Sequence, residues 1–162
     1  MDIKIRKATK EDLAAVAEVE ARCFPEAEAA SKASLEKRIK AFTESFFVAI
    51  IDEKIIGFIN GCITNEIIIH DEMFSDISLH NPNGDHQAIF GLDVVPEYQN
   101  QGIAAQLMKH MIEVARSSGR KGLILTCKDK LIHYYAKFGY ENKGLSNSQH
   151  GGAEWYDMIL EF

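Results

Sequence analysis

A short run of residues between positions 92 and 104 has the composition of a phosphate-binding turn. Its sequence, Leu-Asp-Val-Val-Pro-Glu-Tyr-Gln-Asn-Gln-Gly-Ile-Ala, leads from an apolar strand through a short loop directly into a helix. Gly102 and Ala104 are small enough to let a ligand approach the backbone closely. The first amides of a helix have no acceptor within it and lie at the positive end of its dipole, so they attract anions. The run matches neither the Walker phosphate loop nor the G-x-G-x-x-G pattern, and an ordinary strand-to-helix connection explains its local spacing equally well.

The same loop carries a specific resemblance. Gln99-Asn-Gln-Gly102-Ile-Ala104 resembles the Gln/Arg-x-x-Gly-x-Gly/Ala motif of the GNAT N-acetyltransferase superfamily. The resemblance implies that acetyl-CoA is a co-substrate, that its pyrophosphate lies on the loop amides and that its pantetheine arm bonds to the preceding strand. It implies no metal ion. The implied cofactor-binding residues are Leu92, Asp93, Val94, Gln99, Asn100, Gln101, Gly102, Ile103 and Ala104.

A second motif follows in the order typical of the family. Tyr134-Tyr-Ala-Lys-Phe-Gly-Tyr140 is similar to its helix-end pattern of tyrosine, a short spacer, glycine and an aromatic residue. Over nearly the whole chain the sequence resembles the arylalkylamine N-acetyltransferase branch, notably at residues 49–64, 82–84 and 125–129. The resemblance implies one GNAT-like domain over residues 1–162, in which a small-molecule amine attacks the thioester of acetyl-CoA directly.

That reaction requires two proton movements. A primary amine with a pKa near ~10.4 is mostly protonated at neutral pH, so a base or a water chain must remove a proton. The CoA thiolate leaves more readily if an acid protonates it. Tyr135 matches the tyrosine of the family on this helix, and the resemblance implies that it is the catalytic acid. Ring packing is the ordinary role of such a tyrosine, and Tyr134, on another face of the helix, is the alternative candidate.

The base is the point at which the sequence departs from the arylalkylamine branch. In that branch two histidines on the strand before the loop supply the proton path, and Ala88 and Phe90 stand at those positions here. The candidate substitutes are His86, which would share their strand face, Asp93 and Glu66. The ordinary role of the two carboxylates is a solvated or capping one. Bulk water without a dedicated base is an equal alternative, so the amine stays unidentified.

Two other kinds of chemistry are not supported by the sequence. The region between positions 70 and 86 contains three histidines: His70, His80 and His86. Their spacing matches no known set of metal ligands. The chain also contains an odd number of cysteines: Cys23, Cys62 and Cys127. Free thiols in a reducing compartment are expected, with Cys127 as a small buried residue rather than a nucleophile.

The elements that must position these residues follow from the hydrophobic pattern. A helix after Thr9 places Leu13, Val16, Ala17 and Glu20 at helical spacing. Further helices are predicted over residues 34–42, 102–118 and 131–138. Strands are predicted over residues 3–8, 45–51, 55–63, 87–95, 123–127, from 140 onward, and 154–160. This order predicts an α/β fold, a GNAT-like mixed sheet of about seven strands with flanking helices.

Bulk composition limits the function classes. With 162 residues, 46% hydrophobic and 26% charged, the chain suits a single globular domain. A net charge of −6 argues against a nucleic-acid partner. Neither a secretory signal nor an apolar run of ~18 residues is present, so no membrane partner and a cytoplasmic location are expected.

The acceptor site and the competing functions complete the predictions. Residues 24–34 and 66–84 are expected to build the acceptor pocket, and the first of these segments is expected to close over the substrate. The alternatives to small-molecule acetylation are a protein or peptide N-acetyltransferase and a catalytically weak acyl-CoA-binding sensor. Because family members commonly form homodimers, the resemblance also implies a homodimer as a state to consider.

Overall fold

A hairpin of apolar strands forms the centre of the first of two units into which the chain folds. The computed structural model describes residues 2–162, and this first unit comprises the chain up to Gly61 together with Gly91–Met111. Its antiparallel sheet has the strand order β1 (Lys4–Lys7), β2 (Phe46–Ile51), β3 (Lys54–Asn60), β6 (Gly91–Val94). Asp52 and Glu53 join β2 to β3 with positive φ angles of 49° and 67°, the geometry that a tight hairpin turn requires.

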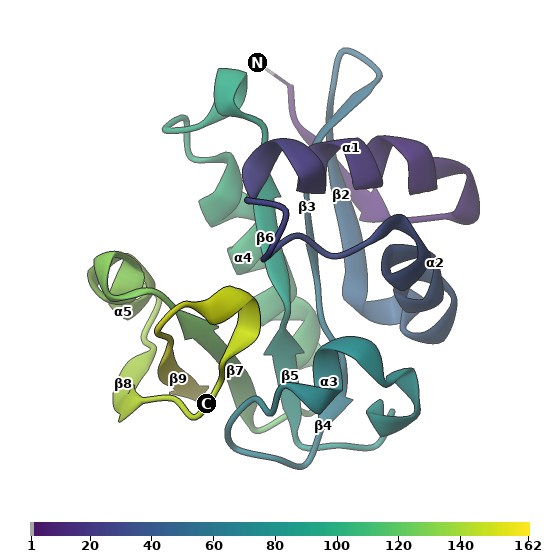
Figure 1. Cartoon of the computed structure of the whole chain (residues 1–162). Coiled ribbons are helices and arrows are strands. Elements are labelled where there is room, and N and C mark those ends of the chain that lie inside the picture. The colour runs from purple at the N-terminus through teal and green to yellow at the C-terminus, as the bar shows by residue number, and fades with distance from the viewer. Residues whose placement is uncertain (1) are drawn as a thin grey trace. The chain divides into compact units, whose positions relative to one another are not determined.

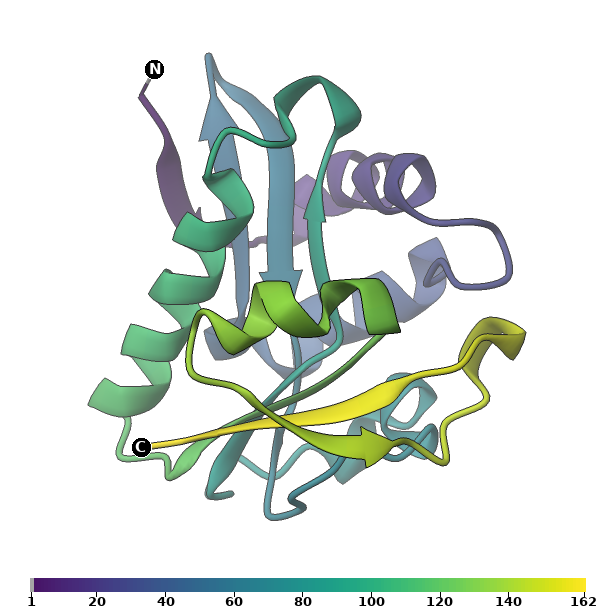
Figure 2. The same ribbon diagram turned by 90° about the vertical axis from the view of Figure 1, so that its left-hand side faces the viewer.

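Helices cover both faces of this sheet. Helix α1 (Leu13–Cys23) contacts β3 and β6, and it packs against α2 (Lys32–Ala41). Figures 1 and 2 show α1 and α2 on one face and the beginning of α4 (Ile103–Ser117) on the other. The largest completely buried side chains of this unit are apolar: Leu35, Phe46, Phe58, Ile59, Ile103, Leu107, Met108 and Met111. Their removal from water is the main source of the stability of the unit.

The second unit comprises Cys62–Phe90 and Ile112–Phe162. Its five-stranded sheet has the order β4 (Ile63–Thr64), β5 (His86–Ile89), β7 (Gly122–Cys127), β9 (Tyr156–Glu161), β8 (Glu141–Leu145). Strands β5 and β7 run parallel, whereas the other pairs are antiparallel. The short helices α3 (Glu72–Ser75) and α5 (Ile132–Ala136) belong to this unit.

The predicted GNAT-like α/β fold is confirmed, and its strands are more divided than the sequence indicates. Residues 2–162 contain nine strands in two sheets because two predicted strands are each interrupted. The prediction of one continuous strand over residues 87–95 is wrong. After Phe90 the chain leaves β5 and its partner β7, and from Gly91 it pairs with β3 instead. Glycine suits this change of partner, since a Cβ at position 91 would lie 3.2 Å from Asn60 Nδ2, which is closer than ordinary contact.

Candidate active site

The strand before the predicted phosphate loop lies at the edge of its sheet. Within the described chain β6 pairs only with β3, and the amide of Val95 donates to Ile56 O at 2.9 Å. Because backbone groups alternate along an antiparallel strand, those of Leu92 and Val94 point away from β3. An edge of this kind can hydrogen-bond to an extended ligand as a further strand would.

The loop after β6 leaves the first amides of α4 available to a ligand. Residues Pro96–Tyr98 form a 3-10 helix, Asn100 has φ of 63° and Gly102 has φ of 83°. The amide of Gln106 donates to Gly102 O at 3.1 Å, so the amides of residues 103–105 have no acceptor within the helix. Apart from its two chain neighbours, no described residue lies within 4 Å of the place that a Cβ at Gly102 would occupy. The geometry therefore suits an anion that approaches the backbone.

Side chains fix the shape of this loop. Gln99 Nε2 donates to Val94 O at 2.8 Å, and Gln101 Nε2 donates to Glu97 O at 3.4 Å. Glu97 in turn forms an ion pair with Arg22 of α1. The predicted residues of the loop thus act in two ways: Gln99 and Gln101 brace the turn, while Gly102 and the residues after it present backbone amides.

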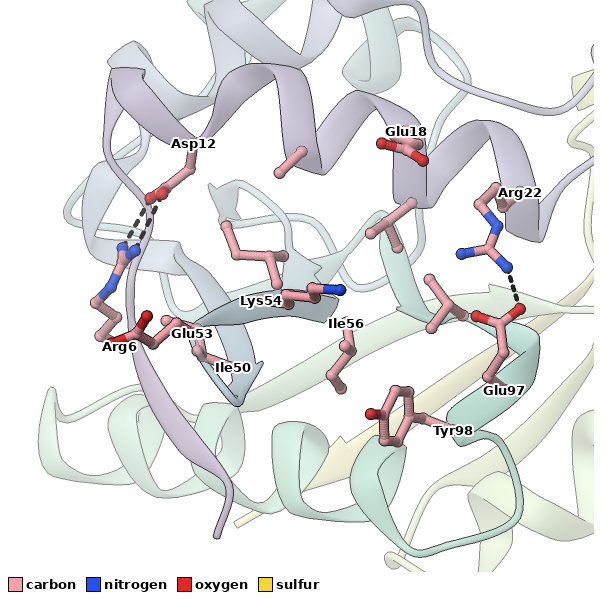
Figure 3. Close-up of a pocket in the computed structure, with 14 residues that line it drawn as sticks. Arg6, Asp12, Glu18, Arg22, Ile50, Glu53, Lys54, Ile56, Glu97 and Tyr98 are labelled. Carbon is pink, nitrogen blue, oxygen red and sulfur yellow. Dashed lines mark hydrogen bonds and ion pairs between the residues drawn. The ribbon is translucent and has the colours of Figure 1, made fainter. Parts of the chain in front are cut away.

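A pocket of about 850 Å³ lies beside this brace in the first unit (Figure 3). Its floor is apolar, with Ala15, Val19, Ile50, Ile55, Ile56 and Val95 among the lining residues. Two ion pairs cross its rim, Arg6 with Asp12 and Arg22 with Glu97, and the ammonium of Lys54 points into it (Figure 3). Because Arg6 and Arg22 are already paired, this rim chiefly fastens β1 to Asp12, the N-cap of α1, and α1 itself to the 3-10 helix that precedes the loop.

A cluster of buried polar side chains lies between α1, α2 and the sheet of the same unit. Glu20 is 6% exposed, Arg38 6%, Asn60 0% and Asp93 1%. A Cβ at Gly91 would lie 3.2 Å from Asn60 Nδ2, 3.3 Å from Asp93 Oδ1 and 3.9 Å from Glu20 Oε1. Arg38 Nη1 donates to Asn60 Oδ1 at 3.3 Å. Two carboxylates, an amide and a guanidinium therefore converge beside the first residue of β6.

The electrostatics of this cluster are unusual. Burial raises the pKa of Asp93 well above its ordinary value, the neighbouring Glu20 raises it further, and Arg38 lowers it. Burial, together with the charges of Asp93 and Glu20, also raises the pKa of the Cys23 thiol to about 12. Cys23 donates to Val94 O at 3.3 Å. A thiol that stays protonated is a poor nucleophile. Cys127, predicted to be a small buried residue, is 2% exposed, and burial raises its pKa to about 11.

The candidate bases differ sharply in environment. Glu66 is exposed and lies 3.6 Å from His70, as a solvated carboxylate would. For Asp93 the expectation of a solvated or capping role is wrong, because both its oxygens are buried and receive no hydrogen bond from any described residue. His86 is 5% exposed, and its Nε2 lies 3.5 Å from Glu161 Oε2 in the second unit. Sequence reasoning did not select Glu20, although the signal was present: an acidic residue on the apolar face of α1.

Tyr135 lies in the second unit, on α5, whereas all nine predicted cofactor-binding residues lie in the first. Its half-buried ring contacts those of Tyr134 at 5.2 Å and Tyr140 at 6.0 Å between centroids. Burial raises the pKa of Tyr134, and burial together with Tyr135 raises that of Tyr140. Both helix tyrosines therefore remain candidates for the acid, while the completely enclosed Tyr140 is part of the packing.

A row of half-exposed aromatic rings, here called the aromatic patch, also belongs to the second unit. It consists of Phe90, Phe74, His150 and Trp155, with successive centroids 5.0, 5.0 and 6.0 Å apart. Asp157 of β9 is buried near this patch. It pairs with Thr126 of β7, and the preceding residue, Leu125, pairs with Ile89 of β5, which adjoins Phe90 in the chain. One oxygen of Asp157 receives no hydrogen bond from the described residues, and burial raises its pKa.

Histidines of the second unit have mainly structural contacts. His80 Nδ1 accepts a hydrogen bond from the amide of Ile63 at 3.0 Å, and burial lowers its pKa. Over residues 2–162 no group of three or more His, Cys, Asp and Glu side chains is placed to hold a metal ion. In the same residues no helix has both the length and the apolar character needed to cross a membrane.

The fold and the loop define a class of protein, and comparison with known proteins identifies it. Residues 13–140 match the model of the acetyltransferase (GNAT) family, so the chain belongs to that family. This membership indicates an acyltransferase that uses acetyl-CoA.

Solved structures agree on the fold at low sequence identity. A GphF GNAT-like decarboxylase in complex with isobutyryl-CoA is 20% identical, with a TM-score of 0.84 over 98% of both chains. The PaiA N-acetyltransferase from Thermoplasma acidophilum, in complex with coenzyme A, is 20% identical, with a TM-score of 0.75 over 100% of both chains. The ribosomal-protein-S18-alanine N-acetyltransferase from Escherichia coli is 19% identical, with a TM-score of 0.74 over 99% of this chain and 94% of that one.

Proposed function

We propose that this protein is an N-acetyltransferase that moves the acetyl group of acetyl-CoA to the primary amine of a small molecule. The observation that carries the proposal is the continuous path from the free edge of β6 to the unbonded amides at the start of α4. Within the predicted segment Leu92, Asp93 and Val94, the strand edge would bond to the pantetheine arm through the outward backbone groups of Leu92 and Val94, because those of Asp93 face β3. The loop from Gln99 to Ala104 would hold the pyrophosphate, with left-handed Gly102 at the point of closest approach.

The aromatic patch supports an acceptor with an apolar body. Large apolar side chains that reach the surface as a group are typical of binding sites. Phe90 stands at a position where the arylalkylamine branch has a histidine. At this surface an apolar ring therefore takes the place of a side chain that could transfer a proton. The buried Asp157 would attract the ammonium group of the acceptor. A peptide N-terminus with an apolar first residue satisfies the same chemistry and is the second acceptor to test.

Acid catalysis is assigned to Tyr135. The amine nitrogen forms a bond to the acetyl carbon, the carbon–sulfur bond breaks, and the tyrosine hydroxyl gives its proton to the departing sulfur. The proton that the new amide nitrogen loses restores the hydroxyl. Tyrosine is suited to this exchange because its ordinary pKa of ~10 is close to that of a thiol.

The proposal is tested by measuring thiol release from acetyl-CoA with a panel of amines: arylalkylamines, alkylamines, polyamines, aminoglycosides and short peptides. We expect turnover with small amines that carry an aromatic or alkyl body. Trp155→Leu should raise the KM for the amine and leave that for acetyl-CoA unchanged. Leu145→Ala, at an exposed apolar residue of the preceding strand, is the matched control and should alter neither constant.

Two results would contradict the proposal in different ways. Acetyl-CoA binding by calorimetry without thiol release from any amine would favour the sensor alternative. Turnover confined to peptides, and unaffected by Trp155→Leu, would favour a peptide N-acetyltransferase.

A further inference from the structure

The buried cluster beside Gly91 has the properties of a proton acceptor, and this inference rests on the proposed function. We propose that Glu20 and Asp93 share one proton and that this carboxylate pair, through water bound in the cluster, takes up the proton that the acceptor ammonium must lose. Arg38 and Asn60 would be positioning residues that hold the pair in place.

Charge balance favours one shared proton. Two carboxylates and one guanidinium lie together with exposed fractions of only 6% (Glu20), 1% (Asp93) and 6% (Arg38), and a buried net charge is costly. With one proton between Glu20 and Asp93, the pair carries a single negative charge that Arg38 balances. Both carboxylates adjoin the same point of the chain, since a Cβ at Gly91 would lie 3.3 Å from Asp93 Oδ1 and 3.9 Å from Glu20 Oε1. The remaining titratable groups that act here are the Cys23 thiol, which stays protonated, and Arg22.

Unsatisfied polar atoms indicate where water would bind. Both oxygens of Asp93 and the Nδ2 of Asn60 are buried, and none has a hydrogen-bond partner among the described residues. Buried polar atoms are nearly always satisfied, and an internal water that makes about three hydrogen bonds is the usual partner. Such a water would contact Asp93 and carry protons to and from it.

The position of the cluster along β6 suits the reaction. The phosphate-binding loop follows the C-terminal end of the strand, so an extended pantetheine arm that pairs with the edge would run toward its first residue. The four residues of β6 span roughly 13 Å at ~3.3 Å per residue. The thioester would therefore lie near Gly91, which the Asp93 and Glu20 carboxylates adjoin.

The connection after α1 links the pair to the expected acceptor site. The amide of Ala30 donates to Glu20 Oε2 at 2.7 Å. Residues 24–34, which sequence analysis assigns to the acceptor pocket, are therefore bonded directly to one member of the pair.

The protons balance as follows. The ammonium gives one proton through water to the carboxylate pair and becomes the free amine that attacks the acetyl carbon. The second proton lost by nitrogen replaces the one that the tyrosine gives to sulfur. The pair then returns its proton to bulk water, so the products are the amide, CoA thiol and one proton.

The test uses the full chain with the amine of the panel that is acetylated fastest. Asp93→Asn and Glu20→Gln keep shape and remove one carboxylate each, and each should lower kcat at pH 7 by about 100-fold, the lower range for a general base. The loss should shrink as the pH rises toward the pKa of the amine, ~10, because the free amine needs no base. The KM for acetyl-CoA should not change. Glu18→Gln, an exposed carboxylate on the same helix, is the control and should behave like the parent protein.

The outcomes separate the inference from the function on which it rests. If an amine is acetylated and both variants keep the parent kcat and pH profile, the inference fails alone. A loss of kcat that is equal at every pH would indicate a structural role and would also overturn it. If acetyl-CoA binds and no amine is acetylated, the proposed function fails and the inference fails with it. Thermal unfolding and CoA calorimetry show whether each variant is folded, and Asp93→Glu should restore part of kcat only if a carboxylate is required.

Discussion

Replacing Gly102 by alanine separates the two effects that a side chain would have at the proposed phosphate site. Gly102 has φ of +83°, and apart from its two chain neighbours no residue between 2 and 162 comes within 4 Å of the added Cβ. In the free protein the methyl group therefore meets no clash and costs only the strain of a left-handed backbone, ~1–2 kcal/mol. For a chain of this length, that strain lowers the midpoint of thermal unfolding by roughly 2–8 °C.

In the complex the same methyl group would lie where the pyrophosphate approaches the backbone. Losing one hydrogen bond from an amide to a charged phosphate oxygen costs ~1.5–3 kcal/mol. This loss corresponds to about a 10- to 150-fold rise in the Kd for CoA. Isothermal calorimetry with CoA measures that change, and a thermal melt without ligand measures the strain.

The control is a second glycine with the same conformation. Gly119, just after α4, has φ of +78° and equally open surroundings among the described residues. Gly119→Ala should lower the melting midpoint by a similar amount and leave the Kd for CoA unchanged. The reasoning is refuted if Gly102→Ala binds CoA as tightly as the parent protein, or if both variants lose the same affinity.

Three further predictions concern single residues. Tyr135→Phe should lower kcat by about 100-fold and leave the KM for acetyl-CoA unchanged, whereas Tyr134→Phe should change neither constant. If steady-state kinetics show the loss of kcat in Tyr134→Phe instead, Tyr134 is the acid and Tyr135 is not. Hydrogen bonding from Arg6 lowers the pKa of Asp12, so its contribution is present above the unfolded pKa of ~3.9 and lost as the pH falls through the folded value. Asp12→Asn should therefore cost about 1 kcal/mol at pH 7 and progressively less in acid, as urea unfolding at several pH values would show. Cys23, with a pKa of about 12, should react with iodoacetamide at pH 8 far more slowly than in the urea-unfolded chain; equal rates would contradict its burial.

Local patterns predicted the elements around the phosphate loop. Apolar residues at helical spacing predicted α4, which the structure places at Ile103–Ser117. The polar turn between β2 and β3 is formed by Asp52 and Glu53, both in the left-handed conformation. These signals act over a few residues, so a single sequence contains them.

The division of the strand over residues 87–95 depends on partners that are distant in the chain. Most of its residues suit a strand and Gly91 indicates a local irregularity, but nothing local indicates that β5 pairs with β7 while β6 pairs with β3. The division coincides with close packing around Gly91, where a Cβ would lie 3.2 Å from Asn60 Nδ2 and 3.3 Å from Asp93 Oδ1. Such long-range competition between sheets is not expressed in periodicity.

The buried carboxylates show a second limit. Glu20 follows Leu13, Val16 and Ala17 at helical spacing, so the periodicity predicts that it lies on the buried face of the helix. In the structure its side chain is buried, with an exposed fraction of 6%. Composition rules favour a solvated role for any carboxylate, and they give the wrong environment for Asp93. The conflict between residue type and face was the available signal, and such conflicts tend to mark functional sites.

The alternation of a β-strand explains how four residues can serve both halves of the proposed reaction. In β6 the backbone groups of Leu92 and the amide of Val94 point away from β3 and are open to an extended ligand. Val94 O already accepts hydrogen bonds from Gln99 and Cys23. The side chain of Asp93 instead projects from a face of the sheet, beneath α1, and reaches Glu20. An edge strand that also carries a buried acid therefore fixes the distance between acyl donor and proton acceptor by its own geometry. Because both depend on the pairing of Gly91 with Asn60, a side chain at position 91 should disturb the thioester and the carboxylates together, whereas Gly102→Ala should weaken CoA binding and leave the carboxylates undisturbed.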